Sequence, residues 1–396
     1  MVCHAVGRTY FFDSLRRFFQ GALESAFLSI CLLISIRIFH APNNLKSILV
    51  ALTWLGGTMA PSLTRLASRS SCQATLLGAV LFMAIGSCFI VASIVHTFLA
   101  FLALTTIASI CYRAEGSILI GMYAANYDAR QRASRLALGL TLSAVLAVAF
   151  GQMAGIVLDR DLENYRFLLR AIAACSYACA ICLLAIPSPP VHRPTASLRR
   201  GYLPFLWNDP IFGRLVLHFC LVGIAYQMMV PIKIEYLANG RYGMDLANGR
   251  VMLLGWVVPN LARVCSTQIF GFLFDRIRLI PLRIFNNLLT LAAFLIFFHG
   301  KTLPILLLGS VCIGIAMAGS FVFHSLWIAK VAPAERLPAY MSIYLFVTGV
   351  RSMLAPLLGY ALLAFFSPAG VANVGCFLIL ISTVGFWRLR REAGIH

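Results

Sequence analysis

Three arginines lie within long apolar runs of this sequence: Arg113, Arg263 and Arg351. A guanidinium is planar, permanently charged and able to bind a carboxylate or a phosphate through two parallel hydrogen bonds. Placing a charge deep in a membrane span costs at least about 2.5–3.5 kcal/mol, so each arginine needs a partner or an aqueous cavity. These residues therefore indicate binding of an anionic or zwitterionic substrate. The alternative is a structural bond to a backbone carbonyl or a facing helix.

Other polar side chains stand in the same runs. Those that could line a substrate site beside the arginines are Tyr226, Gln227, Asn260 and Trp327. Small-molecule sites are mostly apolar with a few such polar and aromatic groups, but interhelical hydrogen bonds explain each of the four equally well. His218 and His324 could titrate near neutral pH and take part in proton coupling, with hydrogen-bonded packing as the alternative.

Acidic residues are rarer inside these runs, where we expect only Glu24 and Glu115, with Glu235 at the outer end of a run. Arg113 and Glu115 are two residues apart, about 200° around a helix, so they cannot neutralise one another and each needs another partner. A carboxyl group in a low-dielectric cavity can load and release a proton, which makes Glu24 the main candidate for proton coupling. Alternatively, Glu24 reaches the cytoplasmic edge or pairs with Arg130. Coupling by sodium or by exchange of a second solute stays open.

The sequence contains no recognisable catalytic or metal-binding motif. A membrane enzyme would normally show a His-rich metal motif, two Asp at one depth or a Ser-Lys arrangement. The 12 Cys are scattered in apolar runs without the spacing of metal ligands, which is typical of small buried hydrophobic residues. We therefore predict no catalytic residue, no metal and no cofactor.

The composition indicates which elements hold these residues. Of 396 residues, 61% are apolar and 11% are charged, and the mean hydropathy is +0.88. A soluble domain could not hide so much apolar surface, so lipid must be the main solvent. A helix crosses about 30 Å of hydrocarbon with about 20 apolar residues. Breaks at charges and at Pro, Gly and Asn clusters predict spans at 18–40, 46–66, 73–95, 97–125, 133–158, 166–187, 212–237, 249–274, 279–299, 303–329, 337–366 and 368–387.

These twelve spans predict an all-α, polytopic membrane protein made of two six-helix bundles. The bundles would be residues 1–187 and 212–396, and the hydrophilic stretch 188–211 between them would be a cytoplasmic linker. The first residues lack a small-residue cleavage site, so we expect the first span to be the insertion signal.

The distribution of charge predicts the orientation. With a cytoplasmic N-terminus, most Lys and Arg fall on inner loops and tails, among them Arg8, Arg16, Arg17 and Arg283, and several acids fall outside. This is the positive-inside bias, and it predicts that both termini are cytoplasmic in a bacterial inner membrane or a plasma membrane. The net charge of +19 then reflects topology, and we expect no nucleic-acid partner.

The two halves repeat one another. The segment from Gln131-Arg132-Ala133 to Gly155 lies 204 positions (131 to 335) before the segment from Glu335-Arg336-Leu337 to Gly359. Parallel repetition of a six-helix unit is typical of transporters. Two sets of six spans, a linker in the middle of the chain and internal termini resemble the major facilitator superfamily over nearly the whole sequence.

Single motifs carry the same resemblance. Gly271-Phe272-Leu273-Phe274-Asp275-Arg276 is similar to the cytoplasmic gate motif of that family, whereas the loop Gly57 to Arg65 lacks the corresponding Asp. The resemblance implies that Gly271 allows close helix packing and that Asp275 and Arg276 form a latch.

Two further segments resemble the same family. Arg113-Ala114-Glu115-Gly116 is similar to the Arg-x-x-Gly motif, whose Arg faces a central cavity. Gly151 and Gly155 resemble the antiporter motif, with Gln152 and Met153 in place of a Gly-Pro pair.

Together these observations predict a monomeric secondary transporter that moves a small solute by alternating access, with an anionic or zwitterionic substrate favoured. Membrane lipid and a coupling proton or other ion would be its further partners. Two alternatives stay open: a transporter or flippase of lipids or other amphiphiles, and a membrane receptor that does not transport.

Overall fold

The computed structural model describes residues 2–59, 72–119, 122–123, 126–127, 132–188, 205–332 and 337–392. Their elements are helices, and none is a strand. Eleven of these helices are long and apolar enough to cross a membrane. The remaining predicted span, 46–66, begins with α3 (Asn43–Leu52) and continues into residues outside the described ranges. About twelve spans is therefore the right architecture.

The chain divides into two compact units. Unit 1 contains residues Met1–Ser197 and Ala247–Met252, and unit 2 contains Leu198–Leu246 and Leu253–His396. The predicted linker 188–211 falls largely on residues 189–204, which are outside the described ranges, so the linker remains a prediction. The same is true of the loop after Met59 that ends at Arg65.

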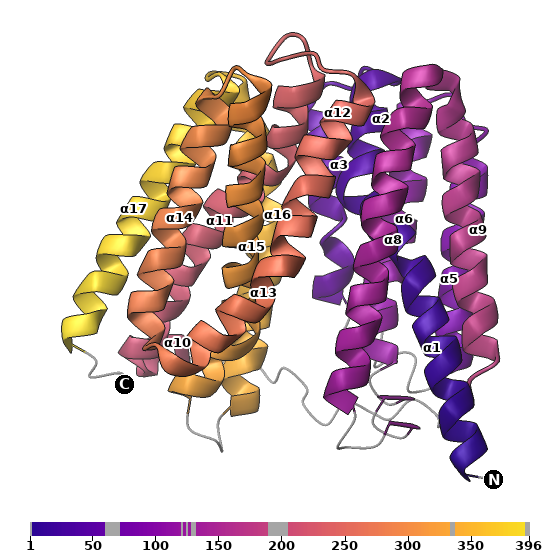
Figure 1. The fold of residues 1–396 in the computed structure, drawn as a ribbon, viewed down its shortest axis with the longest axis horizontal. Coiled ribbons are helices and arrows are strands. Elements are labelled where there is room, and N and C mark those ends of the chain that lie inside the picture. Colours follow the sequence, from indigo (N-terminus) through magenta and orange to yellow (C-terminus); the bar gives the residue numbers. More distant parts are fainter. Residues whose placement is uncertain are drawn as a thin grey trace. The chain divides into compact units, whose positions relative to one another are not determined.

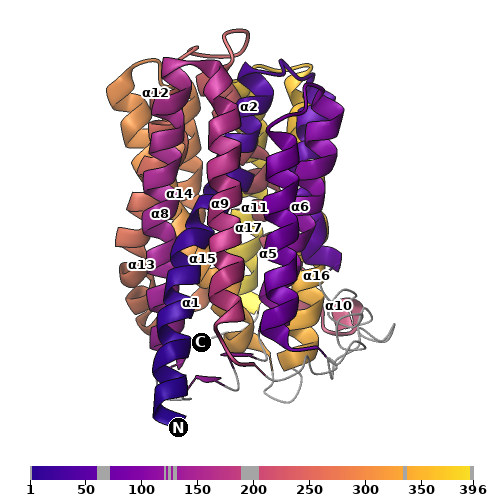
Figure 2. The ribbon, with the colours of Figure 1, turned by 90° about the vertical axis from the view of Figure 1, so that its right-hand side faces the viewer.

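Unit 1 begins with a long helix that contains one π-helical turn. The elements of unit 1 are α1 (Val2–Ser25), the π turn η1 (Ala26–Ile30), α2 (Cys31–Arg37), α3, α5 (Ala74–Ala92), α6 (Phe98–Ile118), α8 (Arg132–Arg160), the 3-10 turn η2 (Leu162–Asn164), α9 (Tyr165–Leu184) and α12 (Asn248–Met252). In Figure 2, α9 lies between α1 and α5, and it packs on both.

The described residues of unit 2 form six long helices and two short elements. These are α10 (Phe205–Asn208), α11 (Pro210–Ala238), the π turn η3 (Leu253–Val257), α13 (Val258–Arg276), α14 (Leu279–His299), α15 (Leu303–Val331), α16 (Leu337–Leu363) and α17 (Pro368–Glu392). The start of α11 shows how sequence sets a boundary: Pro210 occupies the first turn and the Asp209 carboxylate accepts a hydrogen bond from the Phe212 N–H at 3.0 Å.

The packing inside the units repeats. In unit 1, α1 packs on α8 and α9, and α5 packs on α6 and α9; in unit 2, α11 packs on α16 and α17, and α14 packs on α15 and α17. In Figure 1 the unit 2 helices are coloured from pink (α10 and α11) through orange to yellow (α17). Thus α1, α5, α6, α8 and α9 have the same pattern of neighbours as their counterparts α11, α14, α15, α16 and α17. This matching packing agrees with the repeat seen in the sequence.

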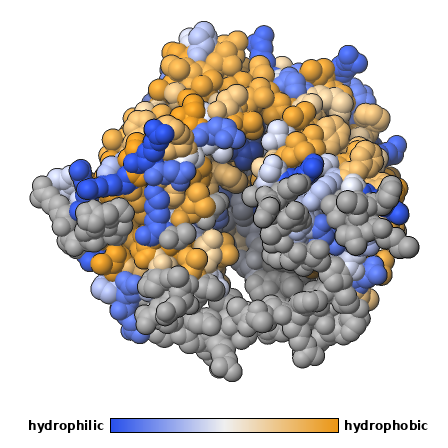
Figure 3. Space-filling view, turned by 60° about the horizontal axis from the view of Figure 1, so that its bottom comes forward, coloured by the Kyte–Doolittle hydropathy of each residue, from blue (hydrophilic) through white to orange (hydrophobic). Residues whose placement is uncertain are grey.

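The outer faces of the helices are apolar. Leu99, Ile181, Phe377 and Phe365 are among the exposed large hydrophobic residues, and Figure 3 shows hydrophobic residues over much of the face in view. Apolar faces of this extent are stable only in contact with lipid or another apolar partner. This surface fits the membrane interpretation of the composition.

The first helix corrects one expectation. We predicted a first span from residue 18, with Arg16 in a cytoplasmic tail, but α1 begins at Val2. Asp13 is 3% exposed and Arg16 is fully buried. Hydropathy excluded the start of α1 from the span because this segment carries charged residues. Asp13 and Arg16 are nevertheless buried, because they are paired inside the protein, as described below.

Candidate functional site

Arg351 of α16 lies against α11 in unit 2. Its Nη1 donates a hydrogen bond to the backbone carbonyl of Phe219 at 2.6 Å. The guanidinium fills the space above Gly223, where an added Cβ would lie 1.9 Å from Nη1. Its Nε is buried and has no hydrogen-bond partner in the described part of the chain. One donor is therefore used structurally, while another faces the protein interior without a partner.

Arg283 of α14 is the second cation of this region, and it is buried whereas Arg351 is half-buried. We predicted Arg283 among the cations of the inner loops. It is 4% exposed, and its guanidinium carbon lies 4.7 Å from the ring centre of Phe219 and 5.2 Å from that of Phe323. Within the described ranges it has no hydrogen bond and no ion pair, and its Nε is buried without a partner. Cation–π contacts offset only part of the cost of burying a charge.

The sequence carried a signal for Arg283. Positions 283, 286, 287 and 290 hold Arg, Asn, Asn and Thr, which is the spacing of one helix face. All four residues are buried. A polar stripe on an otherwise apolar helix indicates a face turned toward the bundle interior.

His324 of α15 and Tyr344 of α16 complete what we call the arginine cluster: Arg283, Arg351, His324 and Tyr344 around Phe219. His324 Nδ1 and the Tyr344 hydroxyl are 3.0 Å apart. Arg351 and Arg283 both contact Phe219, one at its carbonyl and the other at its ring. No described acid forms an ion pair with the cluster. Two like charges thus share an interior region that contains no described counter-charge.

Arg113 of α6 has a similar arrangement in unit 1. Its Nε donates to the Thr53 carbonyl at 3.4 Å and its guanidinium lies 4.3 Å from the ring centre of Trp54. Its two Nη groups form no hydrogen bond with the described residues. The structure therefore leaves the donor fork of Arg113 available to a ligand.

Glu115, two residues after Arg113, belongs to a buried ion-pair network centred on Arg16. Arg16 donates from Nη1 to Glu115 Oε1 at 2.5 Å and from Nε to Asp13 Oδ1 at 2.9 Å. Gln20 bonds both Arg16 and Glu115, at 3.1 and 3.3 Å. Arg16 and its two acids are all buried. This network supplies the separate partner that we predicted Glu115 must have.

Tyrosines on the connection after α6 extend the network. Tyr127 donates to Asp13 Oδ2 at 2.5 Å, and Tyr123 accepts from Arg16 Nη2 at 2.6 Å and from Arg17 at 2.5 Å. Burial raises the pKa of Tyr127, and the neighbouring Asp13 carboxylate raises it further. The Tyr127 hydroxyl therefore keeps its proton and remains a donor.

Glu24 is less enclosed than Glu115. It is half-buried in α1, and the Ser143 hydroxyl donates to its Oε2 at 3.5 Å. Glu24 is one turn from the network and directly before the π turn η1. Glu115, unlike Glu24, belongs to the buried Arg16 network.

The other predicted substrate residues lie in several environments of unit 2. Trp327 is fully buried and stacked between Phe212 and Phe219, so its position is that of a core residue. Asn260 donates to the Trp256 carbonyl of its own helix at 2.7 Å. These two residues support structural roles better than substrate contact.

Gln227 and His218 make contacts between helices. Gln227 donates to the Ser352 hydroxyl at 3.4 Å. His218 packs on Phe386 and fills the space above Gly385, where an added Cβ would lie 1.9 Å from the ring. The fit of His218 against Gly385 favours packing over proton coupling.

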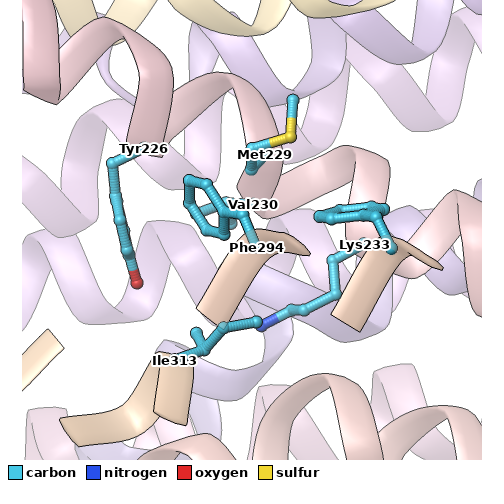
Figure 4. Close-up of a pocket in the computed structure, with 7 residues that line it drawn as sticks. Tyr226, Met229, Val230, Lys233, Phe294 and Ile313 are labelled. Carbon is cyan, nitrogen blue, oxygen red and sulfur yellow. The ribbon is translucent and has the colours of Figure 1, made fainter. Parts of the chain in front are cut away.

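Arg263 and Tyr226 lie close to one another. Arg263 of α13 is half-buried and acts electrostatically on the Tyr226 hydroxyl. Tyr226 also borders a small cavity with Lys233, Met229 and Phe294 (Figure 4). Lys233 was not among the residues that sequence analysis selected.

Comparisons with known proteins identify the family. The sequence pattern of the Major Facilitator Superfamily matches residues 15–301. The chain belongs to this superfamily. A search of curated proteins finds no match.

Solved superfamily structures show the same fold. A mutant of the nucleoside transporter NupG is 14% identical with a TM-score of 0.80, covering 96% of this chain and 99% of that one. The D-xylose-proton symporter is 15% identical with a TM-score of 0.71, covering 97% and 98%. A bacterial homolog of the human lysosomal transporter Spinster, inward-facing and unoccupied, is 13% identical with a TM-score of 0.67, covering 98% and 97%.

The segment that resembles the superfamily's gate motif ends α13. Asp275 and Arg276 are exposed, and Arg276 lies 4.0 Å from the ring centre of Phe272. Asp275 has no hydrogen bond or ion pair within the described ranges, and a Cβ at Gly271 would meet no atom there within 4 Å. The latch and the close packing at Gly271 are absent from the described contacts.

One of the two glycines that resemble the superfamily's antiporter motif, Gly155, has a clear packing role. A Cβ at Gly155 of α8 would lie 2.7 Å from the Asn248 carbonyl oxygen. The Asp159 carboxylate accepts from the N–H groups of Asn248 and Gly249 at 2.5 and 2.8 Å. Gly155 and Asp159 therefore hold the start of α12 against α8 within unit 1.

Proposed function

We propose that this protein is a secondary active transporter of a small anionic solute, including zwitterions with a carboxylate, and that it works by alternating access. The observation that carries the proposal is the pair Arg283 and Arg351. Both lie in the interior of unit 2, each has a buried Nε without a described partner, and no described acid pairs with them.

Magnitudes favour a ligand over a purely structural role for Arg283. Removing an ion from water costs several kcal/mol even after the protein relaxes. Two aromatic contacts return roughly 0.5–2 kcal/mol each. Arg351 adds repulsion instead of relief. A bound carboxylate or phosphate would neutralise the cluster and use its unpartnered donors.

Arg113 supports the same substrate class from unit 1. Stacking on Trp54 holds its guanidinium in place and leaves its Nη groups for an anionic group. Superfamily membership and the transporter neighbours support transport over catalysis. The charge distribution supports cytoplasmic termini in a bacterial inner membrane or plasma membrane.

Proton coupling would be carried by Glu115 in this proposal. Protonation of Glu115 would remove its ion pair with Arg16, while Asp13 would still hold Arg16. Protonation would therefore weaken the charged link between α1 and α6 at Glu115 while leaving the Arg16–Asp13 pair within α1 intact, so a proton at Glu115 would loosen α6 from α1. The D-xylose-proton symporter is a proton-coupled protein of similar fold.

A lipid or amphiphile transporter is the second candidate, because the proteins of similar fold include a homolog of the lysosomal transporter Spinster. An amphiphile with an anionic headgroup would also use the arginine cluster. Its apolar part would add affinity that increases with chain length, about 0.8 kcal/mol per buried CH₂. A receptor that does not transport would bind solute without accumulating it.

A ligand screen tests the proposal. We expect purified protein to melt at a higher temperature with one class of anionic metabolites and not with matched cationic or neutral ones, because ligands that bind only the native state stabilise it. Arg283→Met and Arg351→Met should lose this ligand-dependent rise, while the exposed Arg388→Gln should keep it. A rise with cations alone would contradict the proposed substrate class.

Uptake of the identified ligand into proteoliposomes completes the test. We expect accumulation against its gradient when the inside is made alkaline, and we expect Glu115→Gln to bind the ligand but lose the response to the proton gradient. Binding without uptake would identify a receptor. Uptake by Glu115→Gln that still follows the proton gradient would exclude Glu115 as the coupling residue.

A further inference from the structure

Lys233, near the C-terminal end of α11, is a buried cation outside the arginine cluster. It is 8% exposed, and its ammonium group forms no hydrogen bond or ion pair with any residue of the described ranges. An ammonium is strongly hydrated in water. Burying it without a partner is therefore costly, and the position calls for an explanation.

The nearest acid along the helix does not neutralise Lys233. Glu235 is two residues away, about 200° around the helix. Its carboxylate accepts from the Tyr360 hydroxyl at 2.9 Å and from Asn239 Nδ2 at 3.1 Å. Glu235 is thus directed to another side of α11 and is already engaged there.

Lys233 borders a small, partly open cavity of unit 2. The cavity lies between α11, α14 and α15, and its lining is Tyr226, Met229, Val230, Lys233, Phe294, Phe298 and Ile313. In Figure 4 the Lys233 ammonium and the Tyr226 hydroxyl both point to the side where Ile313 lies. Tyr226 also has no hydrogen bond with the described residues. Two polar groups that can donate hydrogen bonds therefore face one cavity whose other walls are apolar.

The size of the cavity limits what it can hold. Its open space has room for about one water molecule or an ion of similar size. A carboxylate attached to an organic body does not fit. A water could accept one hydrogen bond from Lys233, but it would leave the positive charge uncompensated in a low-dielectric interior.

We propose that this cavity binds a small inorganic anion of chloride size, held by the Lys233 ammonium and the Tyr226 hydroxyl. The anion neutralises Lys233 and accepts from both donors, while the apolar walls exclude larger polar ligands. The site is separate from the arginine cluster, because neither Arg283 nor Arg351 lines the cavity. The proposal therefore does not depend on the proposed substrate.

Chloride titration of purified protein tests the site. Sodium chloride replaces sodium gluconate at constant ionic strength while the melting temperature is measured. We expect a saturable rise, roughly 2–4 °C once chloride exceeds its dissociation constant several-fold. Lys233→Met should melt higher than wild type in gluconate, because it removes an uncompensated charge, and should not respond to chloride. For Tyr226→Phe, the chloride concentration at half-saturation should be roughly 10-fold higher than for wild type, or more.

Two variants locate the effect. Lys301→Met, at an exposed position, and Arg351→Gln should both keep the wild-type chloride response. A wild type that does not respond would overturn the proposal, as would a response that persists in Lys233→Met. A response lost in Arg351→Gln would place the chloride in the arginine cluster instead. If Lys233→Met does not fold, an unchanged half-saturation in Tyr226→Phe rejects the site.

Discussion

Arg16 and Arg283 are both buried, but for different physical reasons. Arg16 has two carboxylates within hydrogen-bond distance, so the protein itself neutralises it. Arg283 has two aromatic rings and no described acid. The first arrangement stabilises the fold, whereas the second leaves a charge that a ligand can complete.

Substitution by methionine should separate these two roles. Arg16→Met leaves Asp13 and Glu115 buried without their cation, so we expect a loss of about 3–5 kcal/mol in stability. Arg283→Met removes an unpaired charge at similar length, so the ligand-free protein should be as stable as wild type or more stable. Melting temperature and folded yield of both variants, measured side by side, provide the comparison. Equal destabilisation of both would give Arg283 a structural role.

Arg113 allows a graded test of anion binding. Arg113→Lys keeps the charge and loses the donor fork, so affinity should fall. Arg113→Ala should weaken it further, roughly 10- to 150-fold, because a charge-assisted hydrogen bond contributes about 1.5–3 kcal/mol. Ligand affinity and melting temperature are measured on the same purified variants. Wild-type affinity with a lowered melting temperature would show that Arg113 only supports packing on Trp54.

At the scale of elements, helix ends and close contacts decide the arrangement. Gly155 lets α12 approach α8, and the Asp159 carboxylate binds the first two N–H groups of α12. The π turns η1 and η3 interrupt two long helices within otherwise apolar runs. Such turns are frequent at functional sites, and η1 follows directly after Glu24 and Ser25.

Two matched substitutions test what the acids at helix ends do. Asp159→Asn should lower stability by about 0.5–2 kcal/mol, because the carboxylate binds backbone donors at a helix start. Asp275→Asn should leave stability nearly unchanged, since Asp275 is exposed and has no contact in the described ranges. Melting temperatures check both. A change in transport rate for Asp275→Asn at normal stability would support the gate role, which remains a prediction.

At the scale of the whole molecule, the topology remains to be tested by labelling. We expect a cysteine at Ser197, in the predicted linker, to react with an impermeant reagent only from the cytoplasmic side, and a cysteine at Lys301 only from the opposite side, because positive loops stay inside. A background without the 12 native Cys and inverted vesicles provide the controls. Labelling of both positions from one side would refute the predicted orientation.

The sequence alone determined the class, the number of spans within the described ranges and most span boundaries. This was possible because insertion into lipid depends on the summed hydropathy of about 20 adjacent residues, a local property. The predicted span 279–299 and α14 agree to the residue. The family resemblance could also be detected from the sequence. The gate-like motif is a run of adjacent residues, and the repeat is a fixed offset along the chain.

Only the tertiary structure decided which charges are buried and which are paired. Arg16 and Glu115 are 99 residues apart, and Arg283 became a site candidate only when the rotation of α14 turned it toward Phe219 and Phe323. Lys233 was overlooked for the same reason. The energy of a buried charge depends on its partners from other helices, and hydropathy within one segment contains no information about them.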